Sequence, residues 1–581
     1  MKSKTMHRIW EMMKGHLKTI MIISIISLII NVGEVVKPYL IKIVIDDYLS
    51  FGIYEKAGMT IAAIGAVYIA IVILGNILDF VTRTITDMMG ENIIYHVRNK
   101  LFKYIEYANI SFHDKTPAGK LFVRITSDAE DISTLFKDVI STIFKDIIMV
   151  IALLGVMIYL SKELSFFAFI IIPFIILAAV ILTTIMNKLE EKVKTAKTKL
   201  NTFFAESIYG IKLIKIFNRQ YEKQKECEQL NKAFKEAKQP TGIVSGFQGG
   251  IMTILENLGI ALIIWACIHH WMGINIEVGM VYIFINYLKQ IFDPVNRIIE
   301  DFETVQEAIV SINKIYDILD HREFLEDREG GRVLDKVDGK IEFKNVWFAY
   351  EGENWVLKDV SFTIEAGKSI ALVGKTGSGK TTITNLINRF YEIQKGEILL
   401  DGVNIKEINI RSLREKIGTI LQDPFLFART IKDNIQLNKN LSDEEIYHAL
   451  NLCSAQSFIE GLPNGIEEVS NERGNSYSAG QKQLLAFARI FAHNPAIFIL
   501  DEATANIDTH TEELIQKSID KISREKTSIF IAHRLSTIVN VDKIIVLNHG
   551  EIIEQGSHHE LLQAGGYYSK LYEAYYESIQ A

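Results

Sequence analysis

Cysteine is scarce in this chain of 581 residues, which contains only Cys227, Cys267 and Cys453. No two of them have the C-x-x-C spacing, so we expect neither a disulfide framework nor a zinc site. The paired histidines His269 and His270 could ligate a metal, but they follow an apolar run. That position favours a place in the membrane interface over a metal site.

The chain also lacks an excess of basic residues and a cleavable signal peptide. Its 63 Lys and Arg stand against 70 Asp and Glu, and the net charge of −7 argues against a nucleic-acid partner. The first apolar run, residues 17–44, is too long for a signal peptide and has no small-residue cleavage site. We therefore expect this run to anchor the chain in a membrane.

Long apolar runs recur through the first half of the chain. Most of them approach the ~20 residues that a helix needs to cross a ~30 Å hydrocarbon layer. A water-soluble domain of this size would not bury so many, so a lipid bilayer is predicted as a partner. Lys145 and Asp146 lie near the start of the third run and leave it short. The six predicted spans are residues 17–44, 59–80, 139–160, 164–186, 247–268 and 274–292.

Lys and Arg are distributed unevenly around these spans. The N-terminus and the two long connections, residues 82–138 and 187–245, are rich in Lys, whereas the short connections between the other spans are poor in basic residues. Because basic residues are retained on the cytoplasmic side, both termini are predicted to be cytoplasmic. The predicted location is the cytoplasmic (inner) membrane, with multiple spans.

The second half contains a phosphate-binding loop. It follows a β-like run, residues 369–373, and matches the pattern G-x-x-x-x-G-K-[ST]. The glycines let backbone N–H groups close around phosphates, Lys380 can reach the β- and γ-phosphate oxygens, and the Thr381 hydroxyl can hold Mg²⁺. The pattern predicts a bound nucleoside triphosphate. The loop residues are Gly374, Lys375, Thr376, Gly377, Ser378, Gly379, Lys380, Thr381 and Thr382.

Two carboxylates follow a second buried strand. Residues 496–500 are continuously apolar, as in a central strand of a parallel sheet, and Asp501 and Glu502 come directly after them. Ligands of open α/β sheets lie at the carboxyl edge, so Asp501 can serve the Mg²⁺ shell while Glu502 polarises the attacking water. The sequence therefore predicts hydrolysis of the bound triphosphate.

The order of these elements resembles the nucleotide-binding domain of the ATP-binding cassette (ABC) proteins over residues 339–581. The resemblance implies that the nucleotide is ATP, that Tyr350 stacks on adenine, that Gln422 contacts ATP and Mg²⁺, and that His533 is the catalytic switch histidine. Residues 477–481 correspond to the family's signature sequence. They read Y-S-A-G-Q, where the family usually has L-S-G-G-Q. The further ATP-contacting residues implied are Ser478, Ala479, Gly480, Gln481 and Asp508.

The long cytoplasmic connections carry a second resemblance. Residues 111–120 and 206–212 are similar to the intracellular loops of multidrug-type ABC exporters, which end in short coupling helices that dock on the ATPase domains. The predicted fold is thus an all-α membrane domain with long cytoplasmic extensions fused to an α/β P-loop ATPase. The predicted domains are a transmembrane domain, residues 1–321, a linker, 322–338, and a nucleotide-binding domain, 339–581.

A single membrane domain with a single ATPase is half a transporter. The resemblance implies that a dimer holds ATP between the phosphate loop of one subunit and the signature of the other. Ser478 reads as the N-cap of a helix through Arg489, whose positive end can meet the γ-phosphate. The signature with a complete Asp501-Glu502 pair is similar to the catalytically complete subunit of heterodimeric exporters. A homodimeric lipid flippase and an importer on the same fold are the alternatives.

The expected activity is ATP-driven export of lipophilic or amphiphilic compounds by alternating access. Charged side chains inside spans are costly and suggest function by default, unless they pair with one another. Glu34, Lys37, Asp79 and Glu256 are such residues. Glu256 lies among apolar neighbours, and a carboxylate in a membrane cavity would favour lipophilic cations.

Overall fold

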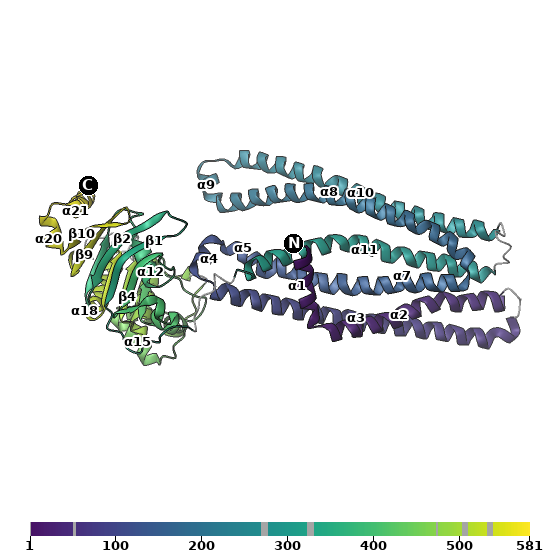
Figure 1. Cartoon of the computed structure of the whole chain (residues 1–581), viewed down its shortest axis with the longest axis horizontal. Helices are drawn as coiled ribbons and strands as arrows, with labels where there is room; N and C mark the ends of the chain where they lie inside the picture. The colour runs from purple at the N-terminus through teal and green to yellow at the C-terminus, as the bar shows by residue number, and fades with distance from the viewer. Residues whose placement is uncertain are drawn as a thin grey trace. The chain divides into compact units, whose positions relative to one another are not determined.

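The computed structural model describes residues 2–49, 54–268, 277–321, 330–471, 474–501, 509–531 and 538–580. The chain divides into two compact units. The first unit is Met1–Glu106 with Pro117–Arg322, and the second is Tyr107–Thr116 with Glu323–Ala581. The second unit contains the β-sheets, and the first consists of long helices (Figure 1). A short segment from the middle of the helical half therefore groups with the C-terminal half.

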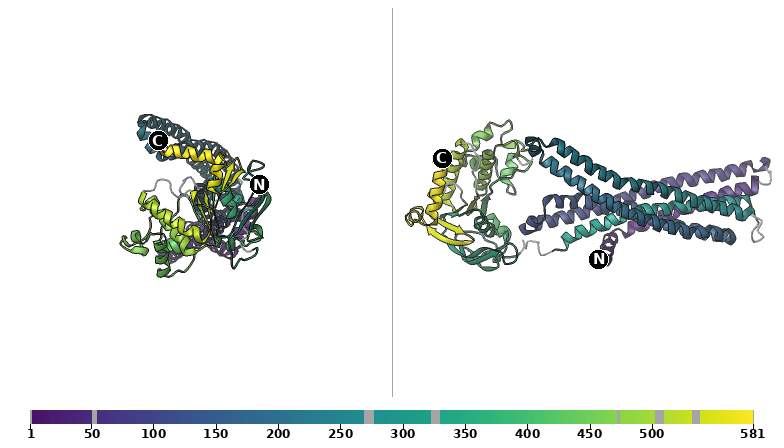
Figure 2. Two further views of the ribbon diagram at one scale, coloured as in Figure 1. Left: turned by 90° about the vertical axis from the view of Figure 1, so that its left-hand side faces the viewer. Right: turned by 90° about the horizontal axis from the view of Figure 1, so that it is seen from above.

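Helices in the first unit run side by side over long distances (Figures 1 and 2). α3, α8 and α10 have 54, 48 and 49 residues. A bilayer takes only about 20 residues, so more than half of each helix extends beyond it, as the sequence predicts. The main helices are α1 (Lys2–Lys14), α2 (Leu17–Ile43), α3 (Tyr54–Tyr107), α5 (Ala118–Val123), α6 (Ala129–Thr134), α7 (Ser141–Leu160), α8 (Lys162–Tyr209), α9 (Ile211–Ile216), α10 (Gln220–Ile268) and α11 (Val278–Leu319).

Among the described residues, five helical segments are long and apolar enough to cross a membrane. They contain the first five predicted spans. The sixth predicted span begins at residues 274–276, which lie outside the described residues, and its remainder opens α11, where Phe284 and Tyr287 are buried. The sixth span stays a prediction. The five segments are Leu17–Tyr48, Gly58–Tyr107, Ala118–Leu160, Lys162–Tyr209 and Gln220–Ile268.

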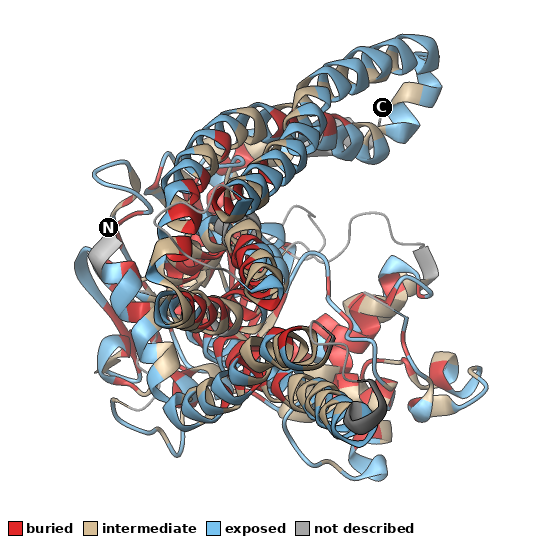
Figure 3. Ribbon diagram, turned by 90° about the vertical axis from the view of Figure 1, so that its right-hand side faces the viewer, coloured by how far each residue is buried: buried red, intermediate tan, exposed pale blue. Residues whose placement is uncertain are grey.

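In the helical unit, buried residues gather on the inner sides of the helices and exposed residues on the outer sides (Figure 3). Leu153 of α7, Ile263 of α10 and Phe284 of α11 are fully buried in one apolar core. Large apolar side chains such as Ile73 and Ile176 are more than half exposed on the outside. An apolar outer surface of this kind is expected where lipid, and not water, surrounds the helices.

The second unit contains two β-sheets. One is a six-stranded sheet of order β10-β9-β3-β8-β7-β6, parallel except for the edge strand β10. The other is antiparallel, of order β2-β1-β4-β5. The strands are β1 (Ile341–Ala349), β2 (Trp355–Ile364), β3 (Ser369–Val373), β4 (Lys395–Leu400), β5 (Val403–Asn404), β6 (Ile417–Ile420), β7 (Ile497–Asp501), β8 (Thr527–Ile531), β9 (Lys543–Asn548) and β10 (Glu551–Gly556).

The central strands are buried on both faces. In β3, Ile370 and Leu372 enter the core that the antiparallel sheet shares, whereas Ala371 and Val373 enter the core formed with the helices of the opposite face. Burial on both faces explains why every residue of β3 after Ser369 is apolar. The helices are α4 (Ile110–Lys115), α12 (Lys380–Ile387), α13 (Ile410–Glu415), α14 (Ile431–Gln436), α15 (Asp443–Leu452), α16 (Gln456–Glu460), α17 (Ala479–His493), α18 (Thr509–Glu525), α20 (His558–Gln563) and α21 (Tyr567–Gln580).

Candidate active site

The phosphate-binding loop lies between β3 and α12. Gly374 is required by close approach, since a Cβ there would lie 2.2 Å from the backbone oxygen of Leu547. Gly377 has φ of +81°, and no heavy atom lies within 4 Å of the position of its missing Cβ. The loop therefore combines a tight approach at Gly374 with a positive-φ turn and open space at Gly377, as phosphate-binding loops do.

Lys380 starts α12, and its side chain folds back over the loop. Its Nζ donates to the backbone oxygens of Gly374 at 2.8 Å and Lys375 at 3.1 Å. Ser378 Oγ is buried and makes no hydrogen bond with the described residues, and Thr381 is exposed. An ammonium group, an unpaired hydroxyl and the N–H groups at a helix start together suit a triphosphate.

Two further predicted residues, Asp501 and Gln422, lie at the same sheet edge. β3, β8, β7 and β6 are adjacent and parallel, so their carboxyl ends lie along one edge. Asp501 is the last residue of β7, and Gln422 comes two residues after the end of β6. β8, which lies between β3 and β7, ends at Ile531, two residues before His533. The topology therefore brings Asp501 and Gln422 to the sheet edge at which the phosphate loop begins.

Tyr350 follows β1 directly and faces the start of α12. Its hydroxyl lies 3.1 Å from Thr382 Oγ1, and its ring meets the edge of Phe348 with centroids 4.9 Å apart. The residue is 42% exposed. The ring is thus held beside the phosphate loop with surface free for a base to stack on it, as the proposed adenine contact requires.

The signature forms the start of α17. Ser478 is the N-cap, and its Oγ accepts a hydrogen bond from the Gln481 N–H at 3.2 Å while Gln481 Oε1 accepts from the Ser478 N–H at 2.9 Å. This reciprocal capping box fixes the helix start, which the sequence predicts. The helix continues to His493, beyond the predicted end at Arg489. Ser478 and Ala479 are exposed, so the helix start is accessible to a second subunit.

Arg489 is a linking residue that the sequence analysis did not identify. From α17 it donates to the backbone oxygen of Phe425 at 2.8 Å and to Asn434 Oδ1 at 2.9 Å. Burial lowers the pKa of Arg489 to about 10, so the guanidinium is still charged at neutral pH. It ties the signature helix to the segment that follows Gln422. The one sequence signal for this role is the position of Arg489 on the buried side of the helix that begins at the signature.

Glu502, Asp508 and His533 lie outside the described residues, as do His269 and His270. The roles of the first three stay predictions. The part of the chain that the structure describes contains no group of three or more His, Cys, Asp and Glu side chains arranged to hold a metal ion. Cys453 is buried, and burial raises the pKa of its thiol to about 12.

Three of the four intramembrane charges are paired. Lys37 Nζ lies 2.6 Å from Glu34 Oε1, and Asp79 accepts from Lys145 at 2.9 Å. Glu256 has no ion-pair or hydrogen-bond partner among the described side chains. Asp146, which shortens the third span, is buried. Its carboxylate accepts hydrogen bonds from Arg297 Nη2 at 2.6 Å and from Arg297 Nε at 2.9 Å.

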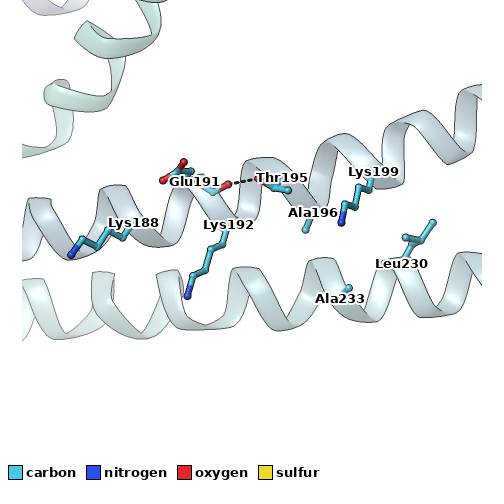
Figure 4. Close-up of a pocket in the computed structure, with 8 residues that line it drawn as sticks. All are labelled: Lys188, Glu191, Lys192, Thr195, Ala196, Lys199, Leu230 and Ala233. Atoms are coloured by element: carbon cyan, nitrogen blue, oxygen red, sulfur yellow. Dashed lines mark hydrogen bonds between the residues drawn. The ribbon is translucent and has the colours of Figure 1, made fainter.

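A groove of about 570 Å³ lies between α8 and α10 (Figure 4). Half of its lining residues are charged and most are exposed, and Thr195 donates to the Glu191 backbone oxygen at 3.0 Å. Such a lining suits neither ATP hydrolysis, which needs the sheet edge, nor a lipophilic substrate. The groove is lined by Lys188, Glu191, Lys192, Thr195, Ala196, Lys199, Leu230 and Ala233.

Comparison with protein families gives two separate matches. Residues 20–295 match the ABC transporter transmembrane region, and residues 357–505 match the ABC transporter family. The first match lies in the helical half, and the second contains the phosphate loop, the signature and the Asp501-Glu502 pair.

Relatives of known name share this organisation. The chain is 36% identical over 495 residues to "Probable multidrug resistance ABC transporter ATP-binding/permease protein YheH" of Bacillus subtilis, covering 84% of this chain and 73% of the relative. It is 33% identical over 574 residues to an ATP-dependent lipid A-core flippase of Haemophilus influenzae, covering 98% and 97%. A solved bacterial Atm1-family ABC exporter with ATP bound has a TM-score of 0.81 and 25% identity, covering 96% of this chain and 98% of that one.

These matches confirm the predicted family, the predicted fold class and ATP binding. They also confirm that the chain is a multi-pass membrane protein, and half-transporters of this kind dimerise. The chain belongs to the ABC transporter family, as an exporter half-transporter in which one helical membrane region is fused to one ATPase that couples ATP hydrolysis to transport.

Proposed function

We propose that this chain is the catalytically complete half of a dimeric exporter that moves lipophilic or amphiphilic compounds, cations above all, across the cytoplasmic membrane. The observation that carries the substrate class is Glu256, the one carboxylate among the four intramembrane charges without a partner in the described part of the chain. The uneven distribution of Lys supports an orientation with both termini and the ATPase in the cytoplasm, where ATP is available.

The position of Glu256 on α10 supports a role in a cavity. Met252, Gly259 and Ile263 are the buried residues around it on this helix. Glu256 follows Met252 by four residues and precedes Gly259 by three, so it lies on the same helix face. That face packs into the apolar core of the helical unit. Glu256 itself is only partly buried. A half-accessible carboxylate on an inward face can attract a cation without paying for complete burial.

We assign each residue of the ATPase site a role from its position relative to the carboxyl edge of the parallel sheet. Tyr350 stacks on adenine, the loop from Gly374 to Thr382 binds the phosphates, and Thr381, Gln422 and Asp501 offer oxygen ligands to Mg²⁺. When bound, Mg²⁺ neutralises charge on the β- and γ-phosphate oxygens. Glu502 orients the attacking water and His533 contacts the γ-phosphate. Asp508 contacts ATP.

Dimerisation completes the site. The exposed, capped start of α17 presents backbone N–H groups and the positive end of the helix dipole to ATP held by the other subunit. ATP then holds the two ATPase domains together, and hydrolysis releases them. The Y-S-A-G-Q signature with its complete Asp501-Glu502 pair favours a heterodimer with a second half-transporter. The near full-length similarity to a lipid A-core flippase supports a homodimeric lipid flippase as the second candidate.

Glu256→Gln tests the proposed substrate class. It keeps the size of the side chain and removes its charge, so transport of lipophilic cations should fall at least about fivefold while transport of neutral lipophilic compounds changes less than about twofold. Both are measured in proteoliposomes with ATP. Glu236→Gln removes a carboxylate from the cytoplasmic part of the same helix and should change neither rate. Equal loss for both substrate classes would assign Glu256 a structural role, and an unchanged cation rate would refute the proposal.

A further inference from the structure

Tyr391 contacts both Tyr350 and the short helix α4, two parts of the ATPase unit that the known motifs do not connect. It lies between α12 and β4, outside every motif of the sequence analysis. Its ring meets the Tyr350 ring edge-on, with centroids 5.0 Å apart and planes at 90°. It also packs edge-on against Phe348 at 5.7 Å. Tyr391 therefore supports one side of the ring that we propose stacks on adenine.

The other end of Tyr391 reaches the short helix α4. Its hydroxyl donates a hydrogen bond to the carboxylate of Asp114, which is 277 positions away in sequence. α4 is itself well fixed, since the Asn109 side chain accepts from the Phe112 N–H at 3.0 Å and Phe112 is 5% exposed. Residues 107–116 belong to the ATPase unit although they connect α3 to α5 of the helical unit.

We propose that Tyr391 is a positioning residue that links adenine binding at Tyr350 to the placement of α4. The inference rests on the proposed adenine contact of Tyr350. A hydroxyl bound to a carboxylate is a directional, charge-assisted contact, and two aromatic rings in edge-on contact favour a particular mutual orientation. A base that stacks on Tyr350 therefore favours the Tyr391 orientation that holds Asp114. By thermodynamic linkage, the factor by which adenine binding favours the bound position of α4 is also the factor by which displacement of α4 weakens adenine binding.

The link predicts a protection of α4 that depends on the base of the nucleotide. Amide hydrogen exchange in residues 109–116 is measured in the full-length transporter with saturating ATP or with saturating inorganic triphosphate, which lacks adenine. ATP should slow exchange of these amides at least threefold more than triphosphate does. Tyr391→Phe and Asp114→Ala should each abolish that difference, and the double variant should add nothing. Asp114→Asn retains an acceptor oxygen and should retain part of the difference.

Tyr567→Phe is the matched control, because the Tyr567 hydroxyl is buried without a hydrogen-bond partner among the described residues. It should leave the ATP-specific protection intact. Equal protection by ATP and triphosphate in the unmodified protein would overturn the link, as would a Tyr391→Phe variant in which the ATP-specific difference in exchange persists.

Tyr350→Ala separates the two proposals. If it leaves ATP affinity unchanged, the adenine contact is wrong and the link is overturned with it. If it weakens ATP affinity while Tyr391→Phe preserves the ATP-specific protection of α4, only the link is overturned.

Discussion

Replacing Lys380 by Ala should weaken ATP binding through loss of one positive charge at the phosphate loop. In the structure the Lys380 ammonium is 2.8 and 3.1 Å from two backbone oxygens of the loop, and the residue is 6% exposed. The ammonium thus lies at the phosphate loop. The substitution removes the donor from the backbone oxygens of Gly374 and Lys375. Both residues are accessible to water, which can replace the lost hydrogen bonds, so the fold should survive the substitution.

The magnitude follows from the type of contact that is lost. A hydrogen bond to a charged group contributes about 1.5–3 kcal/mol. At about 1.4 kcal/mol per tenfold change in affinity, Lys380→Ala should raise the Kd for ATP by about 10- to 150-fold. AMP has neither a β- nor a γ-phosphate, so its affinity should change less than about threefold.

Titration calorimetry on the purified full-length protein measures both affinities. Lys517→Ala, which removes an exposed lysine from α18, serves as the control and should bind ATP as the unmodified protein does. An equal loss of ATP and AMP affinity would indicate a general collapse of the loop. An ATP affinity within threefold of the original would refute the assignment of Lys380 to the phosphates.

Three further predictions concern hydrolysis and pairing. Glu502→Gln should bind ATP normally but lose nearly all turnover and accumulate as a closed dimer; steady-state ATPase within about threefold of the original would defeat its assignment as the principal base. His533→Ala should also spare binding and slow hydrolysis, in contrast to Lys380→Ala, and a matching loss of nucleotide affinity in both would contradict their separate roles. Expressed alone, the chain should show little substrate-stimulated ATPase until a second half-transporter is co-expressed. A stable homodimer with full stimulated activity would favour the flippase alternative.

Much of the ATPase site could be predicted from sequence because its chemistry is local. A glycine loop after a buried strand, as at residues 369–382, contains its own backbone donors and its lysine. The N-cap at Ser478 is equally local, since the cap and its Gln481 partner are three residues apart. Parallel pairing of β3, β8, β7 and β6 then brings the separate motifs to one edge, as buried strands alternating with helices suggest.

The contacts that sequence could not predict are long-range and lack a repeating pattern. Tyr391 and Asp114 are 277 positions apart, and nothing in the spacing of either residue indicates the other. Arg489 looks like an ordinary helix arginine until its acceptors at Phe425 and Asn434 are located. The pairing of Asp146 with Arg297 likewise depends on how α7 and α11 pack, which apolar length alone does not determine.

We propose that ATP hydrolysis at this sheet edge drives export from the cytoplasmic side. Inside-out membrane vesicles containing the transporter expose the ATPase domains to the medium, so added ATP and a labelled lipophilic cation test it directly. The account predicts ATP-dependent accumulation of the cation inside the vesicles, and no accumulation with Glu502→Gln. ATP-dependent loss of the cation from preloaded vesicles, or accumulation that persists in Glu502→Gln, would contradict it.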